Sequence, residues 1–397
     1  MSQYDVAIAG AGPAGSSAAY HLAKAGARVL VLDRARFPRD KPCGGGVTAR
    51  AFAAAPVDLS PVIEESVSRV RFSFRLGSTF DYEYPRTLAY MTQRHRLDAF
   101  LVEAAVAAGA AFTDGSLIRE ARIDDEGGSL RTDGATVEAR VIIGADGATG
   151  AVARGLGLNP APDPPVALEA NFPYDGNAPP APWSGTLALE LGSMSGGYGW
   201  SFPKADHFNV GCGGFSSEGT RLRRHLAALR GHYRLADVAM ENVRGHHLPT
   251  RVAGAAIVRG RGLLVGDAAG LVDPLSGEGI HAAFVSGRLA AEAALALLAG
   301  HEADLASYEA AVERELMPEI GAATLLRDAY SYSPRPCYWV LQRSSLFRRS
   351  LCQLITGEKD YATFLAQIGP LKAFVDLWAG RGRARRRRPA AAGLPRD

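Results

Sequence analysis

The stretch Asp5-Val-Ala-Ile-Ala-Gly10-Ala-Gly12-Pro-Ala-Gly15 decides the fold of the first part of this chain. An apolar strand runs directly into Gly-x-Gly-x-x-Gly and then into a helical stretch at residues 16–25. In this pattern Gly10 permits a tight turn, Gly12 lets a pyrophosphate approach the backbone, and Gly15 allows close packing of helix on strand. The free N–H groups at the helix start favour phosphate. The stretch therefore predicts a Rossmann-like nucleotide-binding unit.

A second strand and an acidic residue complete this unit. Residues 29–32 form an apolar strand that ends at Asp33, 18 residues after Gly15, and Arg34 follows directly. A carboxylate at that distance accepts hydrogen bonds from ribose hydroxyls. A glycine fingerprint alone is weak evidence, but strand, fingerprint, helix, strand and acid in this order favour a dinucleotide site over a simple structural turn.

A second glycine-rich segment lies far along the chain: Leu263-Leu-Val-Gly266-Asp267-Ala-Ala-Gly-Leu-Val-Asp-Pro274-Leu-Ser-Gly277-Glu-Gly279-Ile280. It reads as a buried strand that ends in the carboxylate of Asp267, followed by a Gly/Pro turn and a helix at residues 279–298. An unrelated buried strand and turn would have the same pattern. Together with the first segment, it predicts a cofactor held at both ends.

Shorter motifs lie between these segments. Residues 141–147 are a strand that ends in Asp146-Gly, which is also an ordinary turn pattern. Arg94 opens a predicted helix, where its planar guanidinium suits a pyrophosphate but a solvated arginine would look the same. Residues 37–47 contain Lys-Pro-Cys-Gly-Gly-Gly, and glycines let a planar ring approach the backbone. Cys43 in this run could equally be a small buried apolar residue.

An aromatic run, Tyr198-Gly-Trp200-Ser-Phe202-Pro203-Lys204, follows later in the chain. In an extended strand Tyr198, Trp200 and Phe202 share one face and form a rigid apolar wall. The same pattern is typical of a half-buried sheet with an aromatic core face. A ligand wall and a plain core therefore both remain open at this point.

Taken together, these motifs resemble the geranylgeranyl reductase family of FAD-dependent oxidoreductases, which have the hydroxybenzoate hydroxylase-type flavoprotein fold. Residues 41–44 are similar to the family's Lys-x-Cys-Gly segment, and residues 198–204 to its Tyr-x-Trp-x-Phe-Pro-Lys run. The resemblance extends over residues 3–300 and more weakly beyond. Two positions depart from the family pattern: Asp33 replaces a glutamate, and Gly150 stands where a serine is common. The second departure puts the nicotinamide contact in doubt.

The motif order and the resemblance predict an α/β protein with a discontinuous Rossmann-like FAD-binding domain, an antiparallel-sheet substrate domain and C-terminal helices. The expected segments are 1–70, 90–155 and 250–300 for FAD, 71–89 and 156–249 for substrate, 301–378 for the helices, and 379–397 for a basic disordered tail. The helices would close an apolar tunnel or simply cap the core.

The resemblance also implies which residues contact each group. The expected FAD contacts are Gly10, Gly12, Pro13, Ala14, Gly15, Asp33, Arg34, Cys43, Gly44, Gly45, Gly46, Arg94, Asp146, Asp267, Pro274, Gly277, Gly279 and Ile280. The expected substrate contacts are Tyr198, Trp200, Phe202 and Pro203. Cys43 is a candidate for proton delivery or a purely steric role, and Tyr198 and Trp200 are candidates for stabilising positive charge by cation–π contact.

The implied activity is saturation of C=C double bonds in a geranylgeranyl-type isoprenoid by hydride transfer from reduced flavin, with NADPH or reduced ferredoxin as electron donor. The alternative is a flavin-dependent monooxygenase or halogenase acting on a hydrophobic small molecule. A prenyl carrier without catalysis is a third hypothesis, but it predicts broken flavin motifs, and here the motifs are intact.

Composition agrees with a globular enzyme. The 397 residues are 47% hydrophobic and 21% charged, which is ordinary for a soluble protein. The four cysteines show no Cys-x-x-Cys spacing, so we expect neither a metal site nor a disulfide framework, and a reducing cytoplasm fits. The buried strand begins by Tyr4, and no run of 18 apolar residues occurs, so we expect no signal peptide and no membrane span.

Charge is distributed unevenly along the chain. Residues 379–397 contain seven arginines and one acid, whereas the whole chain has a net charge of only +3. Such a tail could hold the protein to anionic lipid headgroups, giving peripheral membrane association, or it could simply be solvated. We expect no nucleic-acid binding, because the basic run lacks interleaved aromatic residues and the rest of the chain is acidic.

Overall fold

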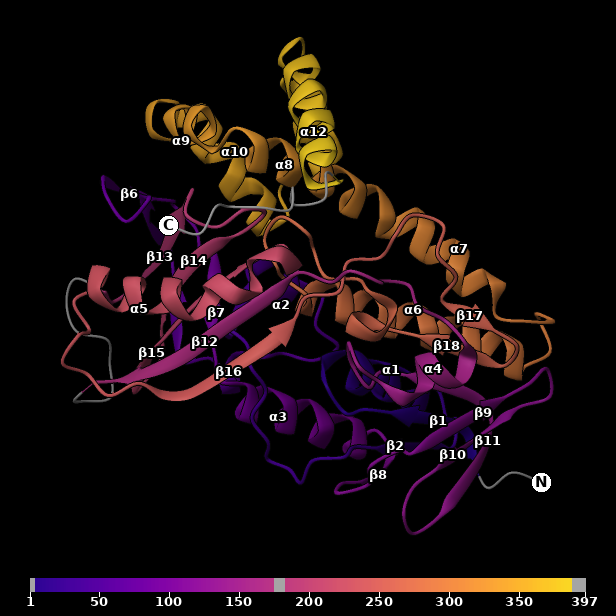
Figure 1. The fold of residues 1–397 in the computed structure, drawn as a ribbon. Helices are drawn as coiled ribbons and strands as arrows, with labels where there is room; N and C mark the ends of the chain where they lie inside the picture. The colour runs from indigo at the N-terminus through magenta and orange to yellow at the C-terminus, as the bar shows by residue number, and fades with distance from the viewer. Residues whose placement is uncertain (1–3, 175–182, 388–397) are drawn as a thin grey trace, which may run out of the picture.

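Strands from three distant parts of the chain meet in one sheet of the computed structural model, which describes residues 4–174 and 183–387 (Figure 1). The central strand β1 (Tyr4–Ala9) is parallel to β2 (Val29–Leu32) on one side and to β11 (Thr136–Gly144) on the other. β8 (Ala111–Thr113) extends the sheet beyond β2, and β18 (Gly262–Leu264) extends it beyond β11. All four residues of β2 are buried, as expected for a parallel sheet that is covered on both faces.

Antiparallel strands extend this sheet beside β11 and β18. β9 (Glu120–Ile123) and β10 (Gly128–Arg131) form a hairpin that pairs with β11, and β17 (Val258–Arg259) pairs with β18. Helices α1 (Pro13–Lys24), α3 (Arg94–Ala107), α4 (Ala151–Leu156), α6 (Ile280–Leu298) and α7 (Ala306–Glu315) belong to this part of the molecule.

The long apolar helix α6 packs along α1. By length and composition alone it could cross a membrane, but two thirds of it is buried within the protein. Close approach of the two helices depends on Gly287, because a Cβ there would lie 2.6 Å from the carbonyl oxygen of Ala14. The apolar surface of α6 is thus used in the core of the FAD-type domain.

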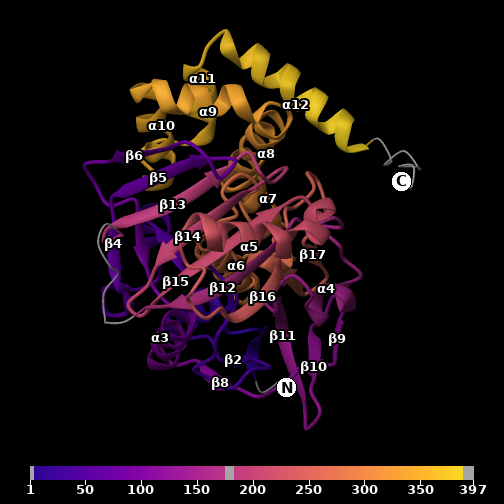
Figure 2. The same ribbon diagram turned by 60° about the vertical axis from the view of Figure 1, so that its left-hand side comes forward.

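A second, seven-stranded sheet stands beside the first (Figure 2). Its spatial order is β16 (Glu241–His247), β12 (Val166–Pro173), β15 (His207–Gly214), β14 (Tyr198–Pro203), β13 (Thr186–Leu191), β5 (Arg69–Phe74) and β6 (Thr79–Glu83). The predicted antiparallel sheet needs one correction: β5 and β13 are parallel. Strands that are distant in sequence meet there through a crossover, and a crossover permits parallel pairing where a hairpin does not. Helix α5 (Leu222–His232) packs on one face.

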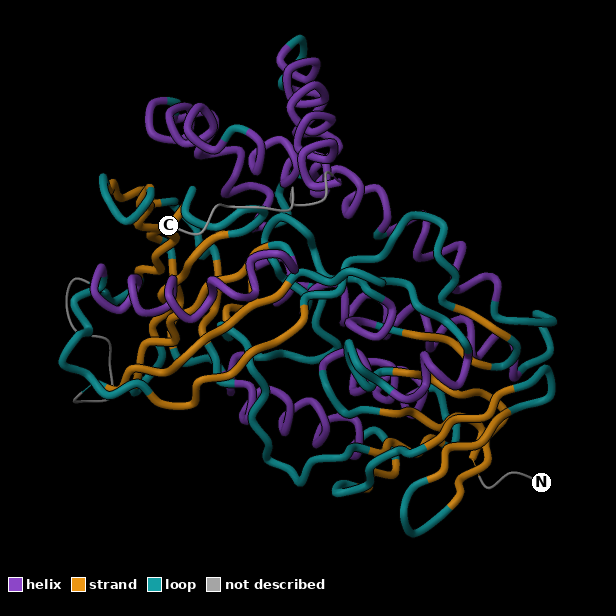
Figure 3. Tube along the Cα trace, viewed as in Figure 1, coloured by secondary structure: helices purple, strands orange, loops and turns teal. Residues whose placement is uncertain are grey.

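Small elements join the two large sheets. β3 (Gly46–Thr48), β7 (Ala89–Met91) and β4 (Glu65–Val67) form a three-stranded sheet, and α2 (Ala49–Ala53) follows β3 directly. Short 3₁₀ turns lie at η1 (Ser60–Val62), η2 (Ser216–Arg221) and η3 (Gly266–Ala269). The tube view shows the strands gathered in the body of the molecule and helices alone at the C-terminal end (Figure 3).

The C-terminal region is helical, as predicted, and the α/β class is confirmed. Its helices are α8 (Met317–Tyr332), α9 (Pro334–Arg343), α10 (Ser345–Thr356), α11 (Tyr361–Gln367) and α12 (Leu371–Arg387).

The prediction of disorder from residue 379 is wrong up to Arg387. Ala379 is fully buried, a Cβ on Gly382 would lie 2.4 Å from the Asp328 carbonyl oxygen, and Arg383 and Arg386 pair with the Asp328 carboxylate at 3.5 and 3.3 Å. These contacts hold α12 on α8. Residues 388–397, with the last two arginines of the predicted tail, lie outside the described residues.

Two helical glycines give a test of the α1–α6 contact. We expect Gly287→Ala to lower the free energy of unfolding by about 1–3 kcal/mol, because the added methyl group forces α6 away from α1. Gly321→Ala on α8 is the matched control. Nothing lies within 4 Å of its Cβ position, so we expect a gain of up to about 1 kcal/mol. Denaturant unfolding followed by circular dichroism measures both, and equal effects would contradict the packing argument.

Candidate functional site

The glycine fingerprint forms the turn that its sequence predicts. Gly10 has φ of 99°, and a Cβ there would lie 2.3 Å from the carbonyl oxygen of Ala145. Gly15 is equally constrained, because its Cβ would lie 1.9 Å from the Gly10 carbonyl oxygen. Pro13 and Ala14 are buried in the first turn of α1. The backbone N–H groups of this helix start are available for a phosphate.

Two guanidinium groups stand next to Gly12. Its Cβ position lies 3.6 Å from Nη2 of Arg39 and 4.0 Å from Nη2 of Arg94. Arg94 donates two hydrogen bonds of 2.8 Å to the fully buried carboxylate of Asp98, and Arg39 Nη1 lies 2.7 Å from the same carboxylate. One carboxylate thus forms ion pairs with two guanidinium groups. The residual positive charge lies beside the phosphate-binding turn.

This arrangement fits a pyrophosphate. Arg39 Nη1 is buried and, within the described residues, makes no contact with hydrogen-bond geometry, although it lies close to Asp98. A buried donor of this kind is costly unless a ligand satisfies it. Burial lowers the pKa of Arg94, but the charges of Asp98 and Cys43 outweigh this effect and raise it, so the guanidinium stays charged. The sequence pointed to Arg94 but missed Arg39.

Asp33 fastens the fingerprint turn. Its Oδ2 accepts a hydrogen bond from the Ala11 N–H at 2.8 Å, and its Oδ1 accepts one from Ala35 at 2.9 Å. A carboxylate oxygen has a second lone pair, so both oxygens can still accept from a ribose. Arg34, which is exposed, lies next to it. Their predicted contacts with FAD stay predictions.

Asp146 has a different immediate function. Its Oδ2 accepts hydrogen bonds from the N–H groups of Ala151 and Val152 at 2.5 and 3.1 Å, and so it caps α4. A Cβ on Gly150 would lie 2.0 Å from Asp146 Oδ1, so a larger residue at this position requires the Asp146 side chain to move. Burial raises the pKa of Asp146. The FAD contact predicted for this residue stays a prediction.

Asp267 lies in η3, directly after β18, as its motif predicts. Lys41 Nζ lies 2.9 Å and His246 Nε2 lies 3.4 Å from Asp267 Oδ2. Burial raises the pKa of Asp267, but the charges and hydrogen bonds of Lys41 and His246 outweigh burial and lower it, so the group is ionised. The other oxygen, Oδ1, lies 3.2 Å from the Cβ position of Gly279, at the start of α6.

The turn between η3 and α6 carries the remaining residues of this motif. Gly277 has φ of 69°, which favours glycine. The carboxylate of Asp273 accepts hydrogen bonds from the Leu275 and Ser276 N–H groups at 2.9 and 2.8 Å, which fixes the turn that begins at Pro274. Ile280 is buried against Phe284 and Val47. A carboxylate and a helix start therefore face the same space, which suits the second end of a flavin.

The Cys-Gly-Gly-Gly loop lies against the aromatic strand. A Cβ on Gly44 would lie 2.8 Å from the Phe202 ring, and one on Gly46 would lie 3.5 Å from it. Gly45 has φ of 63°, and its Cβ position lies 2.2 Å from the Thr92 carbonyl oxygen. Packing against Phe202 and Thr92 therefore requires glycine at positions 44 and 45, and the predicted approach of a flavin ring to this loop stays a prediction. Gly45 also donates a hydrogen bond to Cys43 Sγ at 3.4 Å.

The rings of Tyr198, Trp200 and Phe202 form a row on one face of β14. Their centroids are 6.1 and 6.4 Å apart along the row. Trp200 Nε1 donates a hydrogen bond to Asn209 at 2.8 Å, and the Tyr198 hydroxyl donates one to the Ser276 carbonyl oxygen. The row thus contacts both the glycine loop and the turn before α6.

Pro203 does not share this face. Strand residues alternate, so Pro203 lies with Gly199 and Ser201. A Cβ on Gly199 would lie 2.9 Å from Leu229 of α5, on the opposite side of the sheet. Pro203 therefore lies on the face of β14 opposite the aromatic rings, and its predicted contact with the substrate stays a prediction.

Two ionisable groups near Cys43 were not predicted. Glu169 Oε1 accepts a hydrogen bond from the Cys43 N–H at 2.8 Å, and burial raises the pKa of Glu169 to about 7. Lys204 is 2% exposed, and within the described residues it forms no ion pair within 4 Å; its ammonium lies 3.9 Å from Met91 Sδ. Burial lowers the pKa of Lys204 to about 8, with the charges of Cys43 and Glu64 opposing this shift.

The sequence does contain hints of both groups. Lys204 ends the aromatic motif, and Glu169 alternates with the buried Leu168 and Ala170 on β12. Alternation places Glu169 on the face opposite the apolar core. A polar residue on that face of a buried strand indicates a polar site.

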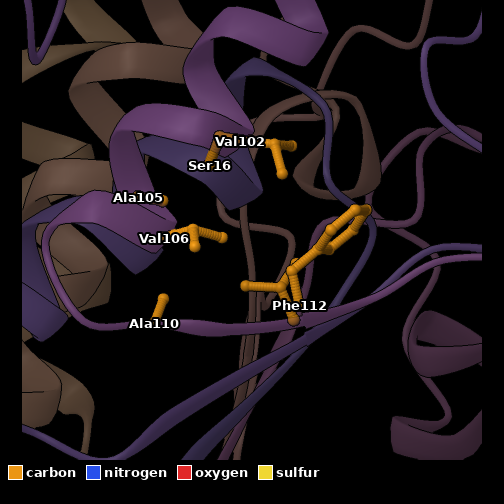
Figure 4. Close-up of a pocket in the computed structure, with 7 residues that line it drawn as sticks. Ser16, Val102, Ala105, Val106, Ala110 and Phe112 are labelled. Carbon is orange, nitrogen blue, oxygen red and sulfur yellow. The ribbon is translucent and has the colours of Figure 1, made fainter.

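The apolar pocket of Figure 4 is a gap in the core and not part of this site. It lies between α1, α3 and strands β2 and β8, with essentially no volume for the centre of a water molecule. Its lining residues are Ser16, Val31, Val102, Ala105, Val106, Ala110 and Phe112. A polar cavity of about 370 Å³ lies elsewhere, beside Arg50 and residues 357–367. Neither is the long tunnel that the C-terminal helices were considered to close.

Comparison with known proteins identifies the family. A family model described as an FAD binding domain matches residues 3–172. A digeranylgeranylglycerophospholipid reductase from Methanopyrus kandleri is 34% identical over 317 residues, which cover 74% of this chain and 80% of that protein. The chain belongs to the geranylgeranyl reductase family.

Solved structures agree at the level of the fold. A geranylgeranyl bacteriochlorophyll reductase-like protein from Thermoplasma acidophilum superposes with a TM-score of 0.76 at 22% identity, covering 94% of this chain and 99% of that one. A flavin-dependent brominase gives a TM-score of 0.71 at 20% identity, covering 93% and 99%. Geranylgeranyl reductase-family and halogenase chains therefore share this fold. The predicted FAD-type α/β fold is confirmed.

Removal of the Asp267 carboxylate tests the flavin anchor. We expect Asp267→Ala to be purified without bound flavin, because it loses the buried carboxylate and leaves Lys41 without its partner. Asp133→Ala is the control, since Asp133 pairs with Arg119 on an exposed hairpin. Visible absorbance per protein, with circular dichroism to verify folding, gives the answer. Normal flavin content in a folded Asp267→Ala protein would rule out the anchor.

The buried Lys204 ammonium predicts a particular pH dependence of stability. The pKa of Lys204 is about 8 in the folded chain, whereas the ordinary value for an exposed lysine is 10.5. Between these two pH values Lys204 is protonated in the unfolded chain but not in the folded chain. The free energy of unfolding therefore rises with pH in that window. Below pH 8 the buried charge costs roughly 3 kcal/mol.

We expect Lys204→Met, measured without flavin, to be about 1–3 kcal/mol more stable than the wild type at pH 7, with the difference shrinking as pH rises from 8 to 10.5. Denaturant midpoints at several pH values measure this. Lys24→Met, at an exposed position, is the control and should show no such trend. A destabilised Lys204→Met protein at pH 7 would show that the ammonium is satisfied in the folded state.

Proposed function

We propose that this protein is an FAD-dependent reductase that saturates C=C double bonds of a geranylgeranyl-type isoprenoid chain, with NADPH or reduced ferredoxin as electron donor. The observation that carries the proposal is the aromatic row of β14, packed on the Cys43–Gly46 loop with two buried ionisable groups beside Cys43. Family membership supports it, since the Methanopyrus relative is named for reduction of a geranylgeranylated phospholipid.

The residues that would hold FAD are spread over both glycine-rich segments. Arg39, Arg94 and the start of α1 suit the pyrophosphate, Asp33 suits the ribose, and Asp267 with the start of α6 suits the second end. Bound and reduced FAD supplies the electron pair for adding hydrogen across an unactivated double bond. The residues of the chain must exclude water, stabilise the developing positive charge and deliver one proton.

The chain has to exclude water and stabilise positive charge. Addition to an isolated alkene leaves one carbon electron-deficient as the reaction proceeds. Trp200 is 9% exposed and Phe202 lies beside it, so the rings offer an apolar face with a negative π surface. Water near that carbon would compete for it, and a closed aromatic face prevents this.

The chain must also deliver one proton to the second carbon. We assign this to the Cys43 thiol, which interacts with the charged groups of Arg94 and Lys204. Lys204, with a pKa of about 8, then returns a proton to Cys43. Glu169 fixes the Cys43 backbone by its 2.8 Å hydrogen bond. Reduced FAD would supply a hydride equivalent, which is two electrons and one proton, and the one proton from the chain then completes the addition of two hydrogen atoms.

An anaerobic single turnover tests the activity. The protein is reduced with dithionite under nitrogen and mixed with geranylgeranyl diphosphate or a geranylgeranylated glycerophospholipid. We expect the flavin absorbance to return while the product gains two hydrogen atoms per bond. If the product instead forms only with oxygen and carries oxygen or a halogen, the monooxygenase or halogenase alternative replaces the reductase.

Truncation of the aromatic row separates substrate chemistry from cofactor binding. We expect Trp200→Ala to keep its flavin but to lose at least about tenfold in kcat/KM for the alkene, which corresponds to roughly 1.4 kcal/mol. Trp200→Phe, which keeps an aromatic face but not the hydrogen bond to Asn209, should retain most activity. Loss of flavin from Trp200→Ala, or unchanged turnover, would contradict the role of the ring as a substrate wall.

A further inference from the structure

Exposed apolar side chains gather on the C-terminal helices. Half of the large exposed apolar residues in the described parts of the chain lie there: Trp339, Leu346, Leu371, Phe374 and Leu377. Their exposed fractions run from 48% for Leu377 to 74% for Leu346. Helices α9, α10 and α12 occupy the same end of the molecule in both views, away from the first sheet (Figures 1 and 2). Five exposed large apolar residues on helices at one end of the molecule need an explanation.

Helix α12 presents two different faces. The face with Val375, Ala379 and Gly382 packs toward α8 and its neighbours. At 100° per residue, Phe374, Leu377, Arg381 and Arg385 lie together on the other side of the helix. All four are exposed. The apolar residues and arginines of that face are therefore available to a partner.

The same region is strongly basic, while the rest of the protein is acidic. Residues 329–387 contain eleven basic and three acidic residues, a net charge of +8, and two of these arginines, Arg383 and Arg386, pair with Asp328 just before this range. Residues 1–328 have a net charge of −6. On α9, the Arg343 guanidinium lies 4.9 Å from the centre of the Trp339 ring. Basic charge and exposed tryptophan and leucine thus occur on one end of the molecule.

We propose that α9, α10 and α12 dock this protein on the surface of an anionic phospholipid bilayer. The side chains that would enter the headgroup region are those of Trp339, Leu346, Phe374 and Leu377. Arg381 and Arg385 would contact lipid phosphates. Helices that lie in this interface combine an apolar face with basic residues, and tryptophan favours the same depth. Apolar insertion and electrostatic attraction are two weak signals that bind stably together.

The charges argue against other partners. A second copy on this face would bring two segments of +8 net charge together, which is unfavourable. A nucleic acid would use the arginines but would leave Leu346, Leu371 and Leu377 exposed to water. A bilayer satisfies both features. The proposal goes beyond the reductase activity and holds whether or not the alkene is the substrate.

Vesicle sedimentation with the full-length flavoprotein tests the docking. We expect binding to phosphatidylcholine vesicles containing about a third phosphatidylserine, weaker binding in high salt, and little binding to pure phosphatidylcholine. Phe374→Ser with Leu377→Ser should lower the partition coefficient at least about tenfold. Arg381→Ala with Arg385→Ala should lower it roughly fivefold per arginine.

Val106→Ser with Val252→Ser is the matched control. Both valines are about half exposed but lie outside the C-terminal helices, so binding should not change. Flavin content and melting temperature verify that each variant is folded. A measurement on the wild type needs no folded variant: brominated phosphatidylserine vesicles should quench the fluorescence of Trp339, and Trp339→Phe should remove that part of the quenching.

Three outcomes would overturn the proposal. The wild type could ignore anionic vesicles and show no quenching. The Phe374/Leu377 variant could bind as well as the wild type, which would leave simple charge adsorption. The same variant could instead change a dimer into a monomer in light scattering while the wild type ignores vesicles, which would assign the face to contact between copies.

Discussion

The buried carboxylate of Asp98 is the interaction on which the cofactor site depends. It lies on α3, yet it fixes Arg94 of the same helix and Arg39 of the loop before Cys43, and so it holds both guanidinium groups next to Gly12. Two cations share one fully buried anion, so the group has an excess positive charge that favours a further anion. A pyrophosphate at the fingerprint turn would supply this negative charge. Folding of the loop and affinity for the cofactor are thus coupled through one side chain.

The charges around Asp267, at the other end of the site, are arranged differently. There one carboxylate is surrounded by Lys41 and His246 and faces the start of α6. Lys41 and Arg39 come from the same loop, so this loop connects the two anchors. The loop continues through Cys43 and three glycines that lie against the aromatic row of β14. The proposed cofactor anchors and the proposed substrate wall are therefore connected by one continuous segment.

The sequence revealed those features whose cause is local. Backbone geometry depends on neighbouring residues, so it can be predicted from short stretches of sequence. This applies to glycine at positions 10, 12 and 15, to the strand that ends in Asp33, and to the alternation of Tyr198, Trp200 and Phe202. No role was predicted for Arg39, Lys41, His246 and Glu169, because each acquires its partner from a distant element.

Two further features depend on elements that are distant in sequence. Pro203 belongs to the aromatic motif by sequence, but alternation along β14 places it on the face toward α5. The arginines after residue 379 look like a disordered tail when charge alone is counted. Asp328 is far away in sequence, and it gives Arg383 and Arg386 a partner and Gly382 a packing surface.

Two buried ionisable groups near Cys43, Lys204 and Glu169, lower the stability of the fold because, among the described residues, neither has a partner of opposite charge in direct contact. Lys204 and Glu169 have opposite charges and lie in the same region, yet they do not form an ion pair. A direct pair would stabilise both charged forms and move the two pKa values apart, which would fix the proton. Kept separate and buried, the groups have pKa values of about 8 and 7. Protonated and unprotonated forms then differ little in energy near neutral pH, which is the condition for transferring a proton and restoring it in each turnover.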